Sequence, residues 1–258
     1  MASDDPIWNE GPEMIKHNGI YYLTYSGNYF GSRSYSVGYA TAKSPLGPFK
    51  KVGENPILQA GSYENISGTG NHSMVDGPGG ESLFFVYHSH TYPQAGGGNR
   101  QVNLDRACFD EQERLCVSGP TVSLQPVPGA GFINNIEIAC GNTELPGLHN
   151  GLITVHKKDA EQRDTILKTD ASGKVELNIK LKKDTVVEAV VIYRGSTDFD
   201  RAELVFDGNI VLKDLSCPEG AEQRSLIALF EPITCEGITV ALYAEPESKI
   251  TISEIQLL

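Results

Sequence analysis

The sequence has one tryptophan, few cysteines and no long apolar run. No stretch approaches the roughly 20 consecutive apolar residues that a membrane span requires, and no apolar segment of a signal peptide follows Met1. We therefore expect no membrane partner. Five scattered cysteines in 258 residues exclude a disulfide scaffold, and no CxxC pair indicates a zinc or redox site. Cys217 and Cys235 would pair if their strands are neighbours, and otherwise are buried free thiols.

Positive charge is also scarce. The chain has 21 basic and 33 acidic residues, a net charge of −12, and the acidic excess is present both before and after residue 130. Without a basic patch to hold phosphate backbones, nucleic acid is excluded as a partner, whereas a neutral small molecule or polymer is compatible. The 40% hydrophobic and 21% charged content is typical of an ordered globular protein.

No segment shows a sustained helical apolar period. What recurs is short runs of β-branched and aromatic residues bounded by Gly, Pro, Asn and Asp, the pattern of strands. In the first 130 residues these runs form two similar sets of four, offset by about 60 residues. A four-stranded repeat of this length predicts a propeller blade, and the alternative is an ordinary antiparallel sandwich. The runs are Glu13–His17, Ile20–Gly27, Ser36–Ala42 and Phe49–Val52, then His72–Val75, Ser82–His88, Gln101–Phe109 and Leu115–Val117.

The pattern changes after the segment Pro128-Gly129-Ala130-Gly131, which predicts one domain over residues 1–130 and another over 131–258. Tyrosine falls from nine residues before this point to two after it, and Asp207-Gly208 predicts a tight hairpin. Short alternating runs at this spacing predict a jelly-roll-like β-sandwich. They are Gly151–His156, Lys174–Lys180, Val186–Tyr193, Ala202–Phe206, Asn209–Leu212, Ser225–Leu229, Gly237–Tyr243 and Lys249–Leu257.

Three residues in the first domain are candidates for chemistry. Glu10 lies between Trp8 and a Gly-Pro turn, where a partly desolvated carboxyl could hold a proton and act as a general acid, although a surface glutamate is the alternative. His72 follows the segment Gly68-Thr69-Gly70-Asn71 and either binds a ligand or is a hydrogen-bonded core histidine. Arg100 follows a run of three glycines and could present its guanidinium to sugar hydroxyls.

Glu10 and His72 begin and end a series of six segments that follow one another in a specific order. The segments are Glu10-Gly11-Pro12, Tyr21–Asn28, Val37–Ala40, Gly47–Phe49, Asn55–Leu58 and Gly68–His72. Together they resemble the C-terminal part of a glycoside hydrolase family 43 catalytic domain, over residues 4–128. The resemblance implies a five-bladed β-propeller that hydrolyses α-L-arabinofuranosyl or β-D-xylosyl linkages of plant polysaccharides with inversion. The expected fold is therefore all-β: a partial propeller of about two blades, followed by a β-sandwich.

By this resemblance, Glu10 matches the family's general acid, which protonates the departing glycosidic oxygen. His72 is similar to the histidine at the propeller axis, which holds a water or a calcium ion and shapes the substrate pocket. Arg100 is similar to the arginine near the sugar subsite. No organic cofactor is implied, and calcium near His72 is the metal that the resemblance suggests.

Inverting hydrolysis needs a second carboxyl group, roughly 6.5–9.5 Å from the acid. The family takes its general base, an aspartate, from the first blade, and a second aspartate that tunes the acid's pKa from a middle blade. By resemblance, about three of the five blades and both aspartates have no counterpart here. The available carboxylates match no family motif; they are Asp4, Asp5, Glu13 and Asp76.

Three arrangements follow from the absent blades. The chain is completed by a complementary propeller chain, or several copies form a homo-oligomer with a shared pocket, or the chain is a non-catalytic remnant. We predict a glycosidase of the arabinofuranosidase or xylosidase type that acts on plant-derived carbohydrate, with a carbohydrate-binding or assembly protein as the alternative. The second domain has six aromatic residues and no tryptophan for stacking on sugars, which leaves open both a supporting role and carbohydrate binding.

Overall fold

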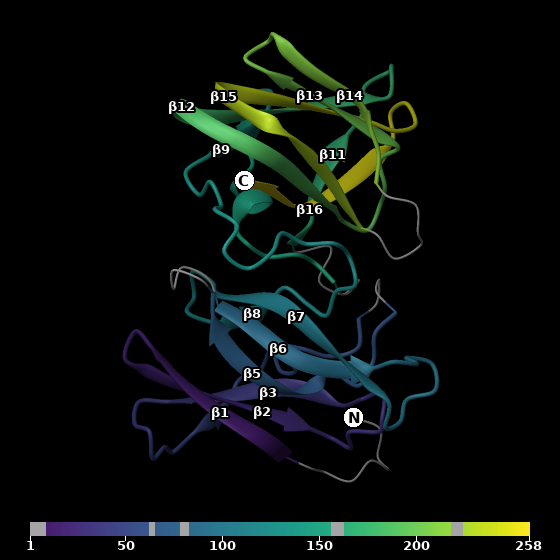
Figure 1. Cartoon of the computed structure of the whole chain (residues 1–258). Coiled ribbons are helices and arrows are strands. Elements are labelled where there is room, and N and C mark those ends of the chain that lie inside the picture. The colour runs from purple at the N-terminus through teal and green to yellow at the C-terminus, as the bar shows by residue number, and fades with distance from the viewer. Residues whose placement is uncertain (1–8, 62–64, 78–82, 156–162, 218–223) are drawn as a thin grey trace. The chain divides into compact units, whose positions relative to one another are not determined.

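The computed structural model describes residues 9–61, 65–77, 83–155, 163–217 and 224–258. The chain divides into two compact units between Val122 and Ser123, eight residues before the boundary expected from composition. The regular structure of both units is built from strands, which confirms the all-β fold class (Figure 1). Within the described ranges, no helix combines the length and the apolar character needed to cross a membrane.

Unit 1 contains two antiparallel sheets of four strands. The first consists of β1 (Asn9–His17), β2 (Ile20–Gly27), β3 (Ser36–Ala42) and β4 (Lys50–Lys51). The second consists of β5 (Gly70–Asp76), β6 (Leu83–His90), β7 (Arg100–Phe109) and β8 (Leu115–Val117). In both sheets the strands lie side by side in sequence order, so each sheet is the meander of a propeller blade. All eight strands overlap the runs from which the repeat was predicted.

The two sheets of unit 1 pack face to face (Figure 1), because apolar side chains alternate along their strands. Tyr22 and Tyr39 of the first sheet share a core with Phe85 of the second, and each is at most 2% exposed. The hydroxyl of Tyr22 donates to the carbonyl of Glu113 (2.7 Å), and that of Tyr39 accepts the backbone N–H of Leu115 (3.2 Å). Buried tyrosines therefore contribute packing and also hydrogen bonds to the β7–β8 segment.

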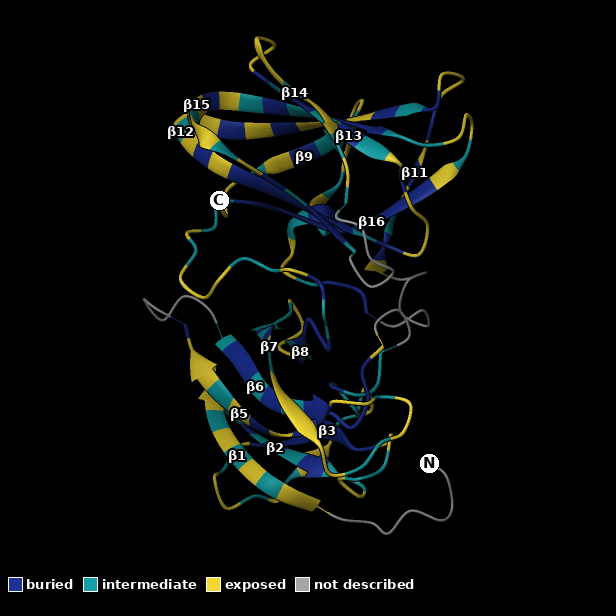
Figure 2. Cartoon of the chain, turned by 45° about the vertical axis from the view of Figure 1, so that its right-hand side comes forward, coloured by how far each residue is buried: buried dark blue, intermediate teal, exposed yellow. Residues whose placement is uncertain are grey.

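Unit 2 begins with β9 (Glu137–Cys140), β10 (Thr143–Glu144) and a 3-10 helix, η2 (Pro146–His149). Six further strands follow: β11 (Thr165–Lys168), β12 (Lys174–Arg194), β13 (Arg201–Phe206), β14 (Ile210–Leu215), β15 (Ser225–Tyr243) and β16 (Lys249–Leu257). The strand β16 is buried over nearly its whole length (Figure 2).

Two long strands, β12 and β15, belong to both layers of unit 2. The first part of β12 pairs with β9 and with the end of β15, which in turn pairs with β13. The later part of β12 pairs with β16 and with the beginning of β15. The two parts face each other across one core that includes Leu177 and Ile179 from one layer and Ile192, Ile252 and Ile255 from the other. This is the layered arrangement of a β-sandwich.

The sequence pattern predicts two short strands in place of β12 and two in place of β15, whereas each is one continuous strand in the structure. The interruption in β12 is an irregular stretch at Lys182–Asp184, where Asp184 has a φ of +56° and the pairing register shifts, while the strand continues. The run expected at Gly151–His156 is not a strand over residues 151–155, and His156 lies outside the described residues. The hairpin at Asp207-Gly208 is confirmed, since Phe206 pairs with Ile210 and both turn residues have positive φ.

All five cysteines are free thiols, so the pair Cys217–Cys235 does not form. Cys235 is buried and Cys217 half-buried, and both belong to the apolar core of unit 2 or pack against it. Burial raises the pKa of both thiols, which keeps them protonated and unreactive at neutral pH.

Candidate functional site

Glu10 lies near the start of β1, the edge strand of the first sheet. A bulge separates its pairing with Ser26 from that of Glu13 with Thr24, and Gly11 in this bulge has a φ of +55°. The Glu-Gly-Pro motif is thus a bulge on an edge strand, where glycine supplies the positive φ and proline costs no ladder hydrogen bond. Glu10 is exposed as a residue, while its carboxyl makes a part-buried hydrogen bond. Trp8, expected beside it, lies outside the described residues.

Tyr35 holds the carboxyl of Glu10. Its hydroxyl donates to Glu10 Oε1 at 2.5 Å, while its ring is fully buried just before β3. Burial, followed by the hydrogen bond to Glu10, raises the pKa of Tyr35 to about 12, so the hydroxyl stays a donor at neutral pH. A Cβ atom on Gly70 would lie inside the Tyr35 ring, which explains why the Gly68-Thr69-Gly70 motif needs its second glycine.

His88 and Arg100 adjoin Tyr35. The ring of His88 stacks on that of Tyr35 with a centroid distance of 5.6 Å, and its Nε2 lies 3.5 Å from a guanidinium nitrogen of Arg100. Burial, with the positive charge of Arg100 second, lowers the pKa of His88 to about 4. Arg100 is exposed and also lies over the ring of Phe30, 5.2 Å from its centroid. At neutral pH this site therefore combines a carboxyl group, a neutral imidazole and a cation.

Two loops carry the outer part of this site. The loop after β2 contains Phe30 and Gly31, and the loop before β7 contains the glycine run that precedes Arg100. The backbone N–H of Gly97 donates to the carbonyl of Gly31 (3.1 Å), and Nε2 of His90 contacts the carbonyl of Phe30 (2.9 Å). Gly97 has a φ of +104°, so the glycines adopt a backbone shape that other residues rarely take.

His72 lies apart from the Glu10 group. It is 7% exposed, stacks on Phe85 with a centroid distance of 5.0 Å, and its Nε2 lies 2.7 Å from Thr24 Oγ1. The Thr24 hydroxyl already donates to the carbonyl of Glu13, so Nε2 is the protonated nitrogen of this bond. Burial lowers the pKa of His72 to about 4. At Nε2 this is the geometry of the core-histidine alternative, whereas Nδ1 is buried and has no hydrogen-bond partner in the structure.

Calcium does not fit the surroundings of His72. The ion takes six to eight oxygen ligands, whereas the neighbours of this imidazole offer one hydroxyl and an aromatic ring. Among the residues that the structure describes, no group of three or more His, Cys, Asp or Glu side chains could hold a metal ion.

Asn71, next to His72 in the sequence, is the residue that reaches the Glu10 side. Its backbone N–H donates to Ser26 Oγ at 2.8 Å, and its Oδ1 lies 3.2 Å from the place where a Cβ on Gly11 would be. Burial alternates along the start of β5, with Gly70 and His72 buried and Asn71 and Ser73 exposed, although Asn71 has a φ of +49° and the pairing register shifts between Gly70 and Ser73. Sequence reasoning missed Tyr35 and His88, which belong to no local motif.

No second carboxylate adjoins this site in the described part of the chain. Glu10 is the one carboxylate found bonded to Tyr35, His88 or Arg100 among those residues. Glu13 is engaged elsewhere, because its Oε2 accepts the backbone N–H of Met74 at 2.7 Å. The other acids considered above contribute nothing here: Asp76 is exposed, and Asp4 and Asp5 lie outside the described residues.

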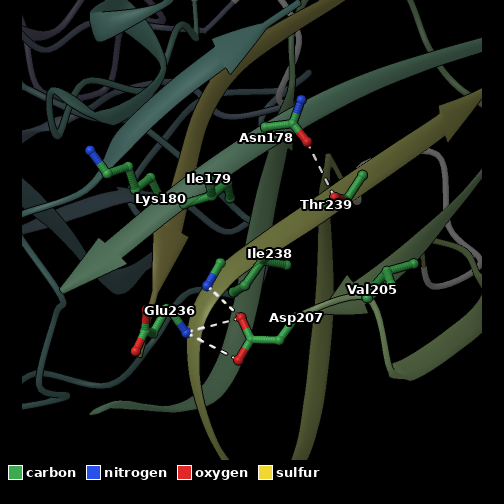
Figure 3. Close-up of a pocket in the computed structure, with 10 residues that line it drawn as sticks. Asn178, Ile179, Lys180, Val205, Asp207, Glu236, Ile238 and Thr239 are labelled. Carbon is green, nitrogen blue, oxygen red and sulfur yellow. Dashed lines mark hydrogen bonds between the residues drawn. The ribbon is translucent and has the colours of Figure 1, made fainter. Parts of the chain in front are cut away.

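Unit 2 presents no aromatic platform, because none of its six aromatic side chains is exposed. A shallow pocket of about 260 Å³ lies where β12, β15 and the β13–β14 turn meet. Figure 3 shows that the Asp207 carboxylate in this pocket turns toward backbone N–H groups, and it accepts those of Glu236 and Gly237 at 3.1 and 2.8 Å. Its oxygens therefore fasten the turn to β15, which is a structural role.

Comparison with known proteins shows what the first unit is similar to. The family model for glycosyl hydrolases family 43 matches residues 2–114. A β-D-galactofuranosidase of Aspergillus niger is 40% identical over 102 residues, which are 40% of this chain and 29% of that protein.

Solved structures are also similar to part of this chain. A thermostable family 43 glycoside hydrolase is 50% identical over 48% of this chain and 40% of its own, with a TM-score of 0.47. An endo-1,4-β-xylanase from Bacteroides thetaiotaomicron is 34% identical over 44% of this chain and 38% of its own, with a TM-score of 0.41. This chain thus spans less than half of these relatives. Its N-terminal part, residues 2–114, matches the model of glycosyl hydrolases family 43 and is similar to members of that family.

Proposed function

We propose that this chain supplies the general acid of a glycosidase, with Glu10 as the proton donor. One observation carries the proposal: within the family 43 segment, Glu10 is held through a single oxygen by Tyr35 and is otherwise exposed. Oε1 is fixed by the tyrosine, so Oε2 is free to carry a proton to a glycosidic oxygen that arrives from solvent. Arg100 lies on the same side and offers donors to sugar hydroxyls.

The proposed reaction is inverting hydrolysis. Glu10 protonates the departing oxygen while a carboxylate on the opposite face of the sugar activates the attacking water. In the described residues no second carboxylate adjoins the site, so we propose a base from outside those residues, with another copy of this chain or a complementary chain as candidate sources. The proposed substrates are plant-derived α-L-arabinofuranosides or β-D-xylosides. The similarity to a galactofuranosidase adds β-D-galactofuranosides, which, like arabinofuranosides, contain a five-membered sugar ring.

The leaving group provides a sharp test. A nitrophenolate departs with little need of a proton, whereas the alkoxide of a natural disaccharide departs only when it is protonated. We therefore expect Glu10→Gln to lower turnover of arabino- and xylo-oligosaccharides about 100- to 10,000-fold, and turnover of the nitrophenyl glycosides much less. The matched control is Glu111→Gln, which changes an exposed carboxylate in the β7–β8 turn. Equal losses on both substrate types would remove Glu10 from the acid role.

The lack of a second carboxylate at the site, within the part of the chain that the structure describes, favours a specific alternative, a non-catalytic protein that binds carbohydrate or assembles with an enzyme. The full chain is assayed alone, at concentrations that populate oligomers, and in any complex with which it purifies. Binding of oligosaccharide without turnover in all three preparations would establish the alternative. A mass measurement in solution separates a monomer from a shared pocket between copies.

A further inference from the structure

We propose that Tyr29 and Phe30 form an aromatic platform on which a sugar ring of a neutral oligosaccharide stacks, beside Glu10. The inference deepens the proposed function, since it names a second subsite next to the same acid. It rests on three observations about the loop after β2: the exposure of the two rings, their contacts toward Glu10, and the hydrogen bonds that hold the loop.

The two rings are exposed and in mutual contact. Tyr29 is 43% exposed and Phe30 37%, and their centroids are 4.7 Å apart with the ring planes tilted by 54°. Single exposed apolar residues are ordinary on a protein surface, but two aromatic rings packed together and open to solvent form a site for a flat, partly apolar ligand. The C–H face of a sugar ring is such a ligand, and its hydroxyls require hydrogen-bond donors nearby.

A continuous series of contacts connects this platform with the acid. Phe30 lies under the guanidinium of Arg100, which lies 3.5 Å from the imidazole of His88. His88 stacks on Tyr35, and Tyr35 donates to Glu10. One sugar ring held over the platform would therefore present its hydroxyls to Arg100, while its neighbour in the oligosaccharide lies toward Glu10.

The platform is held in place before any ligand arrives. The N–H of Ser32 donates to the carbonyl of Tyr29 (2.9 Å), the side-chain amide of Asn28 donates to the carbonyl of Ser34 (2.8 Å), and Gly31 accepts the bond from Gly97. The ring of Tyr29 folds over Gly31, where a Cβ atom would lie 2.8 Å from it. A preorganised loop loses little entropy on binding, which suits it to a weakly attractive ligand such as a sugar.

The local charges favour a neutral ligand. The guanidinium in contact with this group is that of Arg100, and it adjoins a carboxyl group, that of Glu10, which does not favour the carboxylate of an acidic sugar. His88 is neutral at pH 7, because its pKa is about 4. Neutral arabino- or xylo-oligosaccharides match this combination of aromatic faces and one guanidinium.

The test is calorimetric titration of the full chain with arabino- and xylo-oligosaccharides in the Glu10→Gln background, which prevents hydrolysis during the measurement. Tyr29→Leu removes the ring and keeps an apolar side chain, and should weaken binding about 2- to 10-fold. Tyr29→Phe keeps the ring and should bind as tightly as the parent. Leu46→Ala alters an unrelated side chain that is 94% exposed and serves as the control.

A second variant displaces the Tyr29 ring and leaves both aromatic side chains of the platform in the sequence. Gly31 has no positive φ, so Gly31→Ala is tolerated by the backbone, but the new methyl group would displace the Tyr29 ring. We expect weaker binding with unchanged thermal unfolding.

Three outcomes separate the claims. If oligosaccharide binds and neither Tyr29→Leu nor Gly31→Ala weakens it, the platform is wrong while the proposed function stands. If both variants weaken binding and the chain never hydrolyses a glycoside, the platform stands and hydrolysis fails. If the chain binds no oligosaccharide in any preparation, both are overturned.

Discussion

Burial of His72 makes the stability of unit 1 depend on pH. In the folded chain its pKa is about 4, whereas a histidine in the unfolded chain titrates near 6.5. The unfolded state therefore takes up a proton at a higher pH than the folded state. Stability is fully present above pH 6.5 and is lost as the pH falls toward 4.

The size of this loss follows from the two pKa values. A difference of about 2.5 units corresponds to about 3 kcal/mol of unfolding free energy at the acid limit, because each unit is worth about 1.4 kcal/mol. Between pH 7 and pH 5, which is above the range where most carboxylates titrate, the same linkage removes about 2 kcal/mol. His72 is nearly inaccessible to solvent, so little of this difference is lost to screening.

Urea unfolding of the full chain at pH 7 and at pH 5, followed by intrinsic fluorescence, measures the effect. Nine of the eleven tyrosines and the single tryptophan precede residue 130, so the signal reports mainly on unit 1. In His72→Gln the amide can still donate to Thr24 but does not titrate, so its stability should change by about 2 kcal/mol less over this interval. His88, whose pKa is also lowered, is present in both proteins and cancels. Identical pH dependence of the two proteins would refute the argument.

Two further substitutions test the packing around the site. Gly70→Ala places a methyl group inside the Tyr35 ring and should lower the unfolding free energy by about 1–3 kcal/mol, measured by urea unfolding, whereas Gly53→Ala, with open space around it, should not. Asp105→Ala removes a buried acceptor of three hydrogen bonds and should cost about 3 kcal/mol by the same assay, with exposed Asp76→Ala as its control. Unchanged stability in either buried variant would contradict the geometry described here.

The blades of unit 1 were predictable because alternation, turn residues and the repeat all point to the same strands. Unit 2 was harder to predict. Its longest strand, β12, passes through the Lys182–Asp184 stretch, which has the charged, turn-like composition of a loop. Pairing with β15 on both sides carries the strand across that stretch, and pairing between strands distant in sequence cannot be read from local pattern.

The residues of the candidate site were likewise predictable only where the signal lay in a local stretch of sequence. Glu10 could be found because its motif is local, and Arg100 because it follows a glycine run. Tyr35, just before β3, and His88, in β6, join the site only through tertiary packing. Gly70 was the available signal, since a glycine within a strand indicates close approach of another group, but it does not say which group approaches.

The sharing of β12 and β15 between the layers of unit 2 has a consequence for how that unit could be divided or recombined. A sandwich made of two separate sheets can in principle exchange one sheet for a homologous one, because few backbone hydrogen bonds cross between them. Here every cut that separates the layers severs both long strands and the ladder between them. Neither layer is therefore a modular part, and chimeras of this unit have workable junctions in its loops and not between its layers.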